Sequence, residues 1–191
     1  MIVDTSVILI QRILEILMIF LWERFQRLAG SSQGYLDGVG NDAQFSFPFG
    51  ICLDETTGDL FICDSDNHCI RKIDERGDVS TLVGGEAGYQ DGKGNEAWFL
   101  FPFGICMDQE TREMFVTDQD NHKIRGVTVE GVARTVAGSS TGWVDGEDAK
   151  FRYPAGICFD EERKCMYVCD QGNQRIRVVS NDGCYHNCWF L

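Results

Sequence analysis

The sequence contains three copies of one pattern, spaced 52 to 54 residues apart. An Asp-Gly pair occurs once in each copy and begins at Asp37, Asp91 and Asp145. The chain has three prolines, one in each copy, at Pro48, Pro102 and Pro154. Repeats of this length are typical of folds in which similar units stack, because one small unit cannot bury its own apolar surface. The repeat therefore constrains the fold more strongly than any other feature of the sequence.

Each copy consists of short apolar runs separated by turn-forming segments. The runs of the first copy are 50–54, 60–64, 69–74 and 79–85. Those of the second copy are 104–108, 114–118, 123–128 and 133–138, and those of the third are 156–160, 166–170 and 175–180. Runs of about five β-branched and aromatic residues that end in Gly or Asp predict antiparallel strands. We expect an all-β chain in which each copy forms a four-stranded sheet, with the sheets arranged radially as blades of a β-propeller.

The residues that recur in the copies are specific enough to indicate a family. In the first copy they are Gly34, Tyr35, Asp37, Gly38, Ala43, Phe45, Pro48, Gly50, Ile51, Asp64, Asn67, His68, Ile70, Arg71, Gly77, Thr81 and Gly84. The second copy matches from Gly88 to Gly138, and the third from Gly142 to Gly183 with Gln174 in place of the histidine. This pattern resembles the NHL repeat, a β-propeller family. The resemblance implies repeats at 27–84, 85–138 and 139–183 in a propeller of the six-bladed type.

The resemblance also implies a closed ring, to which this chain contributes three blades. Residues 27–30 match the end of a repeat at 81–84, and residues 184–191 form a tail outside the repeat. Three blades alone would leave open sheet edges and an uncovered core. Three explanations stay open: a fragment of a longer propeller, a homodimer of two three-bladed halves, or an N-terminal helix that covers an open face.

The N-terminal segment 1–26 is predicted to form an apolar or amphipathic helix. Residues 7–22 are its most apolar part, interrupted by Gln11, Arg12 and Glu15. A membrane-spanning helix requires about 20 mostly apolar residues, whereas an amphipathic helix tolerates such interruptions. We expect a cytoplasmic chain whose helix packs on protein; the alternative is a membrane anchor at 7–22.

Aspartate, asparagine and arginine recur at fixed positions of every copy. These residues are Asp37, Asp64, Asn67, Arg71, Asp91, Asp118, Asn121, Arg125, Asp145, Asp170, Asn173 and Arg177. Asp and Asn side chains bond backbone N–H groups in turns, and a guanidinium can bind a carboxylate with both of its branches. A residue repeated in every blade belongs to the blade rather than to one unique active site. We therefore expect a structural network that holds the loops of each blade together.

Positions near the prolines at which the copies differ are the candidate binding residues. They are Phe49 in the first copy, Trp98, Leu100 and Phe103 in the second, and Lys150 and Arg152 in the third. Because the repeat does not require large apolar groups there, we expect a contact patch for a protein or peptide on the loop face. The alternative is that the apolar members fill gaps between blades.

The function predicted from these features is a non-catalytic binding or scaffold module that uses no cofactor. No metal site is expected, because Cys165 and Cys169 on one strand would lie too far apart for a single zinc ion. A net charge of −13 disfavours nucleic acid as the partner. Two alternatives are a propeller-type lyase or hydrolase with a metal in the central mouth, and an RNA-binding NHL domain.

Overall fold

The structure is a computed structural model that describes residues 26–146 and 148–180. These residues form three antiparallel sheets and contain no α-helix. Sheet 1 consists of β1 (Gly38–Val39), β2 (Pro48–Leu53), β3 (Leu60–Asp64), β4 (Cys69–Ile73) and β5 (Asp78–Gly84). Sheet 2 consists of β6 (Gly92–Lys93), β7 (Pro102–Asp108), β8 (Glu113–Asp118), β9 (Lys123–Val127) and β10 (Val132–Ala137). Sheet 3 consists of β11 (Pro154–Asp160), β12 (Cys165–Asp170) and β13 (Arg175–Ser180).

The predicted all-β class is confirmed, but sheets 1 and 2 have five strands instead of the four expected. The strand orders are β1-β5-β4-β3-β2, β6-β10-β9-β8-β7 and β11-β12-β13. Sheets 1 and 2 gain a fifth strand because the two residues after each Asp37 or Asp91 pair with the outer strand β5 or β10. Such a pair is too short to show the alternation of apolar and polar residues by which strands are found in a sequence. In sheet 3 the structure describes three strands.

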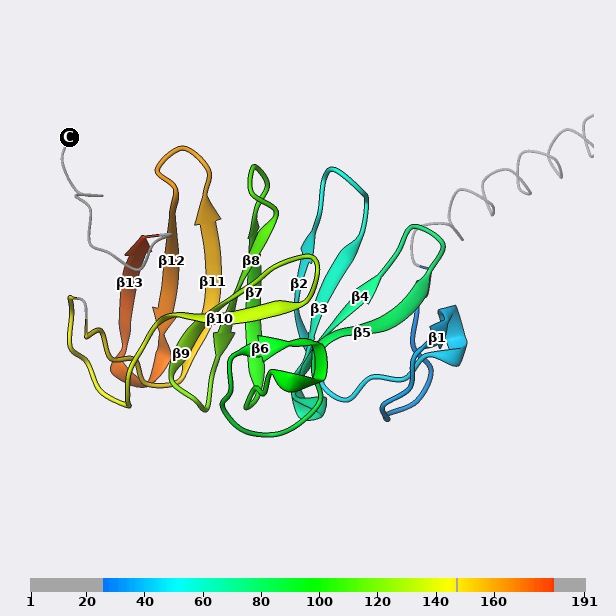
Figure 1. The fold of residues 1–191 in the computed structure, drawn as a ribbon, viewed down its shortest axis with the longest axis horizontal. Coiled ribbons are helices and arrows are strands. Elements are labelled where there is room, and N and C mark those ends of the chain that lie inside the picture. The colour runs from blue at the N-terminus through cyan, green and yellow to red at the C-terminus, as the bar shows by residue number, and fades with distance from the viewer. Residues whose placement is uncertain (1–25, 147, 181–191) are drawn as a thin grey trace, which may run out of the picture.

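The first long strand of each sheet lies next to its counterpart in the following sheet, so that β7 stands between β2 and β11 (Figure 1). Glycine permits this close approach. A β-carbon on Gly50 would overlap the carbonyl oxygen of Phe103 and lie 2.9 Å from the amide nitrogen of Ile105. A β-carbon on Gly104 would overlap the carbonyl oxygen of Ala155. The three sheets therefore radiate from a shared inner edge, a propeller-like arrangement.

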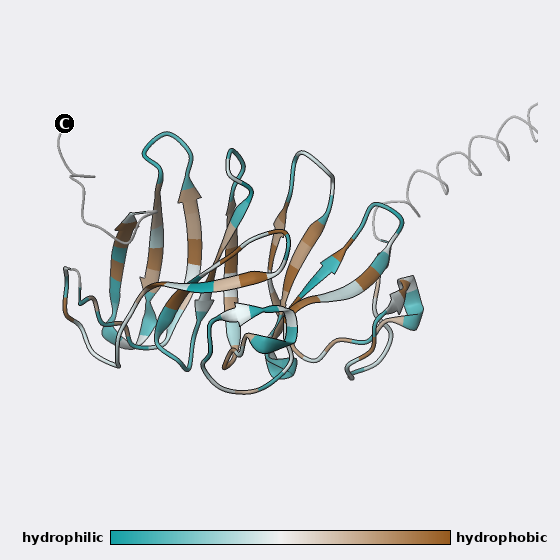
Figure 2. Ribbon diagram, in the orientation of Figure 1, coloured by the Kyte–Doolittle hydropathy of each residue, from teal (hydrophilic) through white to brown (hydrophobic). Residues whose placement is uncertain are grey.

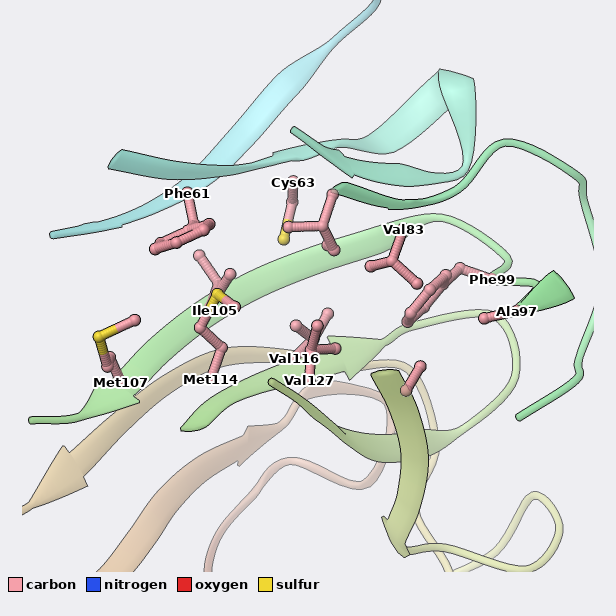
Figure 3. Close-up of a cluster of buried hydrophobic side chains, with 12 residues drawn as sticks. Phe61, Cys63, Val83, Ala97, Phe99, Ile105, Met107, Met114, Val116 and Val127 are labelled. Carbon is pink, nitrogen blue, oxygen red and sulfur yellow. The ribbon is translucent and has the colours of Figure 1, made fainter. Parts of the chain in front are cut away.

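Apolar residues fill the two joints between consecutive sheets, as the brown bands on facing strands in Figure 2 indicate. In the first joint, Phe61 and Cys63 of sheet 1 belong to the same buried cluster as Ile105 and Met114 of sheet 2, with Phe99 beside them (Figure 3). In the second joint, residues of β7, β8 and β9 form a cluster with residues of β11, β12 and β13. We call the face of a sheet that the next sheet covers its leading face, and the opposite face its trailing face.

The helix expected over residues 1–26 lies outside the described residues except for residue 26, as does the tail 184–191. Among residues 26–146 and 148–180, no helix has the length and apolar character needed to cross a membrane.

Replacing Phe99 by alanine is expected to destabilise the chain by about 3–5 kcal/mol, because a fully buried ring in the first joint is removed and a cavity remains. Urea denaturation followed by circular dichroism measures this loss. The control is Val39→Ala on the exposed strand β1, which should change stability by less than about 0.5 kcal/mol. Equal effects of the two changes would contradict the packing of the joint.

Candidate functional site

The arginine of each repeat joins two carboxylates within its own sheet. Arg71 Nη1 lies 2.7 Å from Asp64 Oδ2, and Arg71 Nη2 lies 2.6 Å from Asp37 Oδ1. The same two nitrogens donate to the carbonyl oxygens of Gln44 at 3.0 Å and Leu36 at 2.9 Å. Arg71 and Asp64 are fully buried, whereas Asp37 is half exposed. The guanidinium thus ties the Asp-Gly turn and the end of β3 to the strand β4.

The second carboxylate oxygen and the neighbouring asparagine extend this network to the proline loop. Asp64 Oδ1 accepts the backbone N–H of Ser46 at 2.7 Å. Asn67 Nδ2 donates to Asp64 Oδ2 at 2.8 Å and to the carbonyl oxygen of Gly34 at 2.8 Å. Both carboxylate oxygens of the buried Asp64 accept hydrogen bonds from within the same repeat, so this side chain has a structural role.

The same geometry recurs in sheets 2 and 3. Arg125 lies 2.7 Å from both Asp91 Oδ1 and Asp118 Oδ2. Arg177 lies 2.6 Å from Asp145 Oδ1 and 2.9 Å from Asp170 Oδ2. Asn121 and Asn173 donate to Asp118 and Asp170, each at 2.8 Å. The structure therefore brings together all twelve residues singled out from the repeat, in three equivalent sets of four.

Aromatic rings lie against the buried guanidinium groups. Arg71 Nε and Arg125 Nε are buried and have no hydrogen-bond partner among the described residues. The guanidinium carbon of Arg71 lies 5.2 Å from the ring centroid of Tyr35 and 5.0 Å from that of Phe45. A ring face attracts a desolvated cation, so the repeated Tyr and Phe positions help to hold the buried charge.

Two histidines connect consecutive sheets, a role that was not predicted for them. His68 Nδ1 accepts the backbone N–H of Phe101 at 3.3 Å, and His122 Nδ1 accepts that of Tyr153 at 3.1 Å. Each histidine ring also makes a T-shaped contact with the aromatic ring of the same partner residue. The ring centroids are 4.9 Å apart for His68 and Phe101 and 4.8 Å apart for His122 and Tyr153. The signal that could have found them is their recurrence in the repeat.

The candidate binding residues do not form a single patch. Phe49 and Phe103 stack on each other at the inner edge, with ring centroids 3.5 Å apart. Trp98 instead lies over Gly88 and pairs with Gln90, which precedes β6 at the opposite edge of sheet 2. Phe49 is 54% exposed, so the stacked Phe49–Phe103 pair is not part of a buried core cluster.

The remaining three candidate residues lie in the loops that precede β7 and β11. The backbone N–H groups of Leu100 and Arg152 donate to the aspartates Asp118 and Asp170, each at 2.8 Å. Arg152 is exposed and Leu100 is half-buried. Lys150 lies over Gly142, the position that Trp98 takes in the preceding repeat. These side chains therefore mark the loop face but are not in contact with the Phe49–Phe103 pair.

The described residues offer no group of three or more His, Cys, Asp or Glu side chains that could hold a metal ion. Burial raises the pKa of Cys52 to about 12 and that of Cys63 well above its ordinary value, which disfavours the thiolate form of both side chains.

Replacing Arg125 by methionine is expected to cost about 3–5 kcal/mol of stability, because the buried Asp118 loses its ionic partner and must either keep an unpaired charge or take up a proton. The matched control is Arg134→Met, which removes an exposed ion pair with Glu113 and should cost no more than about 1 kcal/mol. Chemical denaturation of both variants measures the difference. Similar losses would show that the buried network does not stabilise the sheet.

Stability should also depend on the protonation of His68. Burial lowers the pKa of His68, although Asp66 and Asp120 act in the opposite direction, so the folded chain favours neutral imidazole. The unfolded chain begins to bind this proton near pH 6.5, and the folded chain only at a lower pH. The contribution of His68 is therefore complete above about pH 6.5 and decreases as the pH falls toward the folded-state pKa.

The test is His68→Gln, which places at this position the residue that the third repeat has at Gln174. Denaturation midpoints between about pH 5 and about pH 7.5 should fall less steeply for the variant than for the original chain. Carboxylates titrate in both proteins alike, so the difference belongs to His68. Parallel curves would contradict a neutral imidazole of His68 in the folded chain.

Comparison with known proteins places this geometry in a family. A family model described as NHL repeat matches residues 45–73. The chicken (Gallus gallus) NHL repeat-containing protein 2 is 31% identical in an alignment 172 positions long, which covers 79% of this chain and 23% of that protein. The chloroplastic protein SUPPRESSOR OF QUENCHING 1 of Arabidopsis thaliana is 29% identical and is matched over 78% of this chain and 15% of its own length.

A solved structure agrees with these relatives. An auxiliary nutrient binding protein from Bacteroides thetaiotaomicron superposes with a TM-score of 0.64 at 26% identity, over 71% of this chain and 37% of that chain. The chain thus spans less than a quarter of the curated relatives named above. Three repeats in sequence, three propeller-like sheets and these matches agree: the chain carries an NHL repeat at residues 45–73 and is similar to NHL repeat-containing proteins.

Proposed function

We propose that the chain is a non-catalytic binding module that holds a peptide or protein segment on its loop face. The observation that carries this proposal is the stacked Phe49–Phe103 pair, which stays accessible at the inner edge of the sheets. Phe47 extends the aromatic surface, with its ring centroid 6.2 Å from that of Phe49. Exposed aromatic side chains held by rigid strands are typical anchors of protein interfaces.

Charged groups beside the aromatic rings indicate a segment with a basic residue. Asp66 is exposed and lies next to Phe47, because its backbone N–H donates to the carbonyl oxygen of Ser46 at 3.2 Å. Asp120 occupies the same place in sheet 2, where its N–H donates to the carbonyl oxygen of Leu100 at 3.1 Å. Carboxylates and ring faces both attract cations, and a net charge of −13 steers basic partners toward the chain.

The buried arginine networks support this role by fixing the loops. In each sheet the network holds the Asp-Gly turn and the proline loop, which are the segments that flank the candidate surface. A surface whose loops are already ordered loses little conformational entropy on binding. The name of the Bacteroides structure, a nutrient binding protein, is consistent with a binding role for this fold.

The test begins with selection of peptides from a random displayed library against the full chain, followed by calorimetric titration of a selected basic, aromatic peptide. Phe49→Ala and Phe103→Ala are each expected to weaken binding at least about tenfold. Trp98→Ala, which removes an exposed ring from the opposite edge of sheet 2, should change affinity less than about twofold. A larger loss of affinity for Trp98→Ala than for the two phenylalanine variants would place the binding surface at the outer edge of sheet 2, near β6.

A second titration separates peptide binding from the RNA alternative. Labelled single-stranded RNA should bind weakly at low salt and not measurably at higher salt, since the loop face over sheets 1 and 2 carries carboxylates. Tight RNA binding that falls steeply with salt would overturn the proposal.

A further inference from the structure

Sheet 3 presents an apolar leading face that has no sheet on it among the described residues. Ile70 and Ile124, at equivalent positions of sheets 1 and 2, are 0% exposed because the next sheet covers them, whereas Ile176 in sheet 3 is 69% exposed. Cys158 and Cys169 lie on the same face and are likewise exposed, although the equivalent Cys106 and Thr117 are buried. In sheets 1 and 2 the equivalent face is covered by the trailing face of the next sheet, so we expect the leading face of sheet 3 to bind the trailing face of another sheet.

Sheet 1 presents a trailing face of that kind. Ile51 is 59% exposed, whereas its counterpart Ile105 is 6% exposed in the first joint. Leu53 is also exposed, and its counterpart Met107 is buried in the same cluster. The two uncovered faces are thus the two halves of one joint, since the leading face of sheet 3 requires the residues that sheet 1 exposes.

The backbone of sheet 3 is prepared for the same approach. At Gly50 and Gly104 a β-carbon would overlap a carbonyl oxygen of the following sheet, so glycine is required there. Gly156 holds the same position in β11, but a β-carbon on it would touch only Cys169, at an ordinary contact distance of 3.4 Å from Sγ. Nothing within the described chain requires this glycine, whereas a further sheet on the leading face would.

The ion pairs that join consecutive sheets at the other ends of the strands have no counterpart in a contact between sheet 3 and sheet 1. In the first joint Arg112 binds Asp54 of the preceding sheet, with Nη2 2.6 Å from Oδ2, and in the second joint Lys164 binds Asp108, with Nζ 3.2 Å from Oδ1. Sheet 1 has Gly58 at the position of these cations.

Asp160 is the equivalent carboxylate of sheet 3. It is paired within its own sheet, with Arg163 Nη1 3.0 Å from Asp160 Oδ2. A joint between sheet 3 and sheet 1 therefore does not leave Asp160 without a cation, even though Gly58 supplies none.

From these observations we propose that two copies of the chain form a closed pair, in which the leading face of sheet 3 in each copy packs on the trailing face of sheet 1 in the other. Contacts between two different faces either close into a ring or continue as an open filament. Closure covers both apolar faces of each copy, whereas a filament leaves one uncovered at each end. The pair contains twice the three sheets of one chain and so gives a six-sheet ring.

Light scattering coupled to gel filtration tests the pair on the full chain. We expect twice the chain mass of 21.5 kDa for the original protein and for the control Val39→Glu, which alters an exposed residue of the perimeter strand β1. Gly156→Ala and Ile51→Glu should each give the mass of a single chain, because one blocks the backbone approach and the other charges the trailing face. Both residues are exposed in the single chain, so circular dichroism should show unchanged β-structure.

Mixing two variants tests which faces meet. Ile176→Glu blocks the leading face of sheet 3, and Ile51→Glu blocks the trailing face of sheet 1. An equimolar mixture keeps one intact joint, formed by the unaltered leading face of the second variant and the unaltered trailing face of the first. We expect the mixture to recover a mass of two chains that neither variant shows alone.

The remaining outcomes overturn the proposal. A single-chain mass for the original protein would assign the two faces to sheets of another polypeptide. A mass that grows without limit as concentration rises would indicate a filament, and a two-chain mass retained by Gly156→Ala would place the contact on another surface. These results are independent of peptide binding, so failure of the pair and failure of the proposed function can be distinguished.

Discussion

Packing between the apolar faces of consecutive sheets is the interaction on which the rest of the structure depends. The strands in the middle of each sheet carry apolar residues on both faces, so a sheet gains its stability only when other parts of the chain cover it. Glycines at Gly50 and Gly104 let the inner strands come close enough for the joints to close. The radial arrangement follows from this requirement, since a twisted sheet can share one edge with several neighbours only by fanning out from it.

Buried arginines perform a different task, within each sheet rather than between sheets. Arg71, Arg125 and Arg177 each join two carboxylates that come from separate turns of the repeat. A buried ion pair is weak support for stability in general, because the cost of removing two charges from water is high. Its value here lies in specifying the positions of the loops, and the binding role proposed above would require such ordered loops.

Much of this fold could be predicted from the sequence, and the candidate site only in part. The strands were predictable because apolar runs such as 50–54 and 104–108 are short and end at glycine or aspartate, and because each recurs in phase. The fifth strands at Gly38–Val39 and Gly92–Lys93 were not, since two residues carry no periodic signal. Trp98 and Phe103 are both close to Pro102 in the sequence and were therefore assigned to one patch. The chain between them crosses from one edge of sheet 2 to the other, so they lie apart.

The sequence by itself determined that similar small sheets are repeated, which residues recur in each, and that aspartate and arginine of one repeat belong together. Those properties follow from local periodicity and from charge, which are written along the chain. Only the tertiary structure decided that Phe49 stacks on Phe103, that His68 and His122 link one sheet to the next, and that Ile176 and Ile51 remain uncovered. The physical reason is that contacts between repeats, and the faces that such contacts leave uncovered, depend on how closely and at which edge the sheets approach each other.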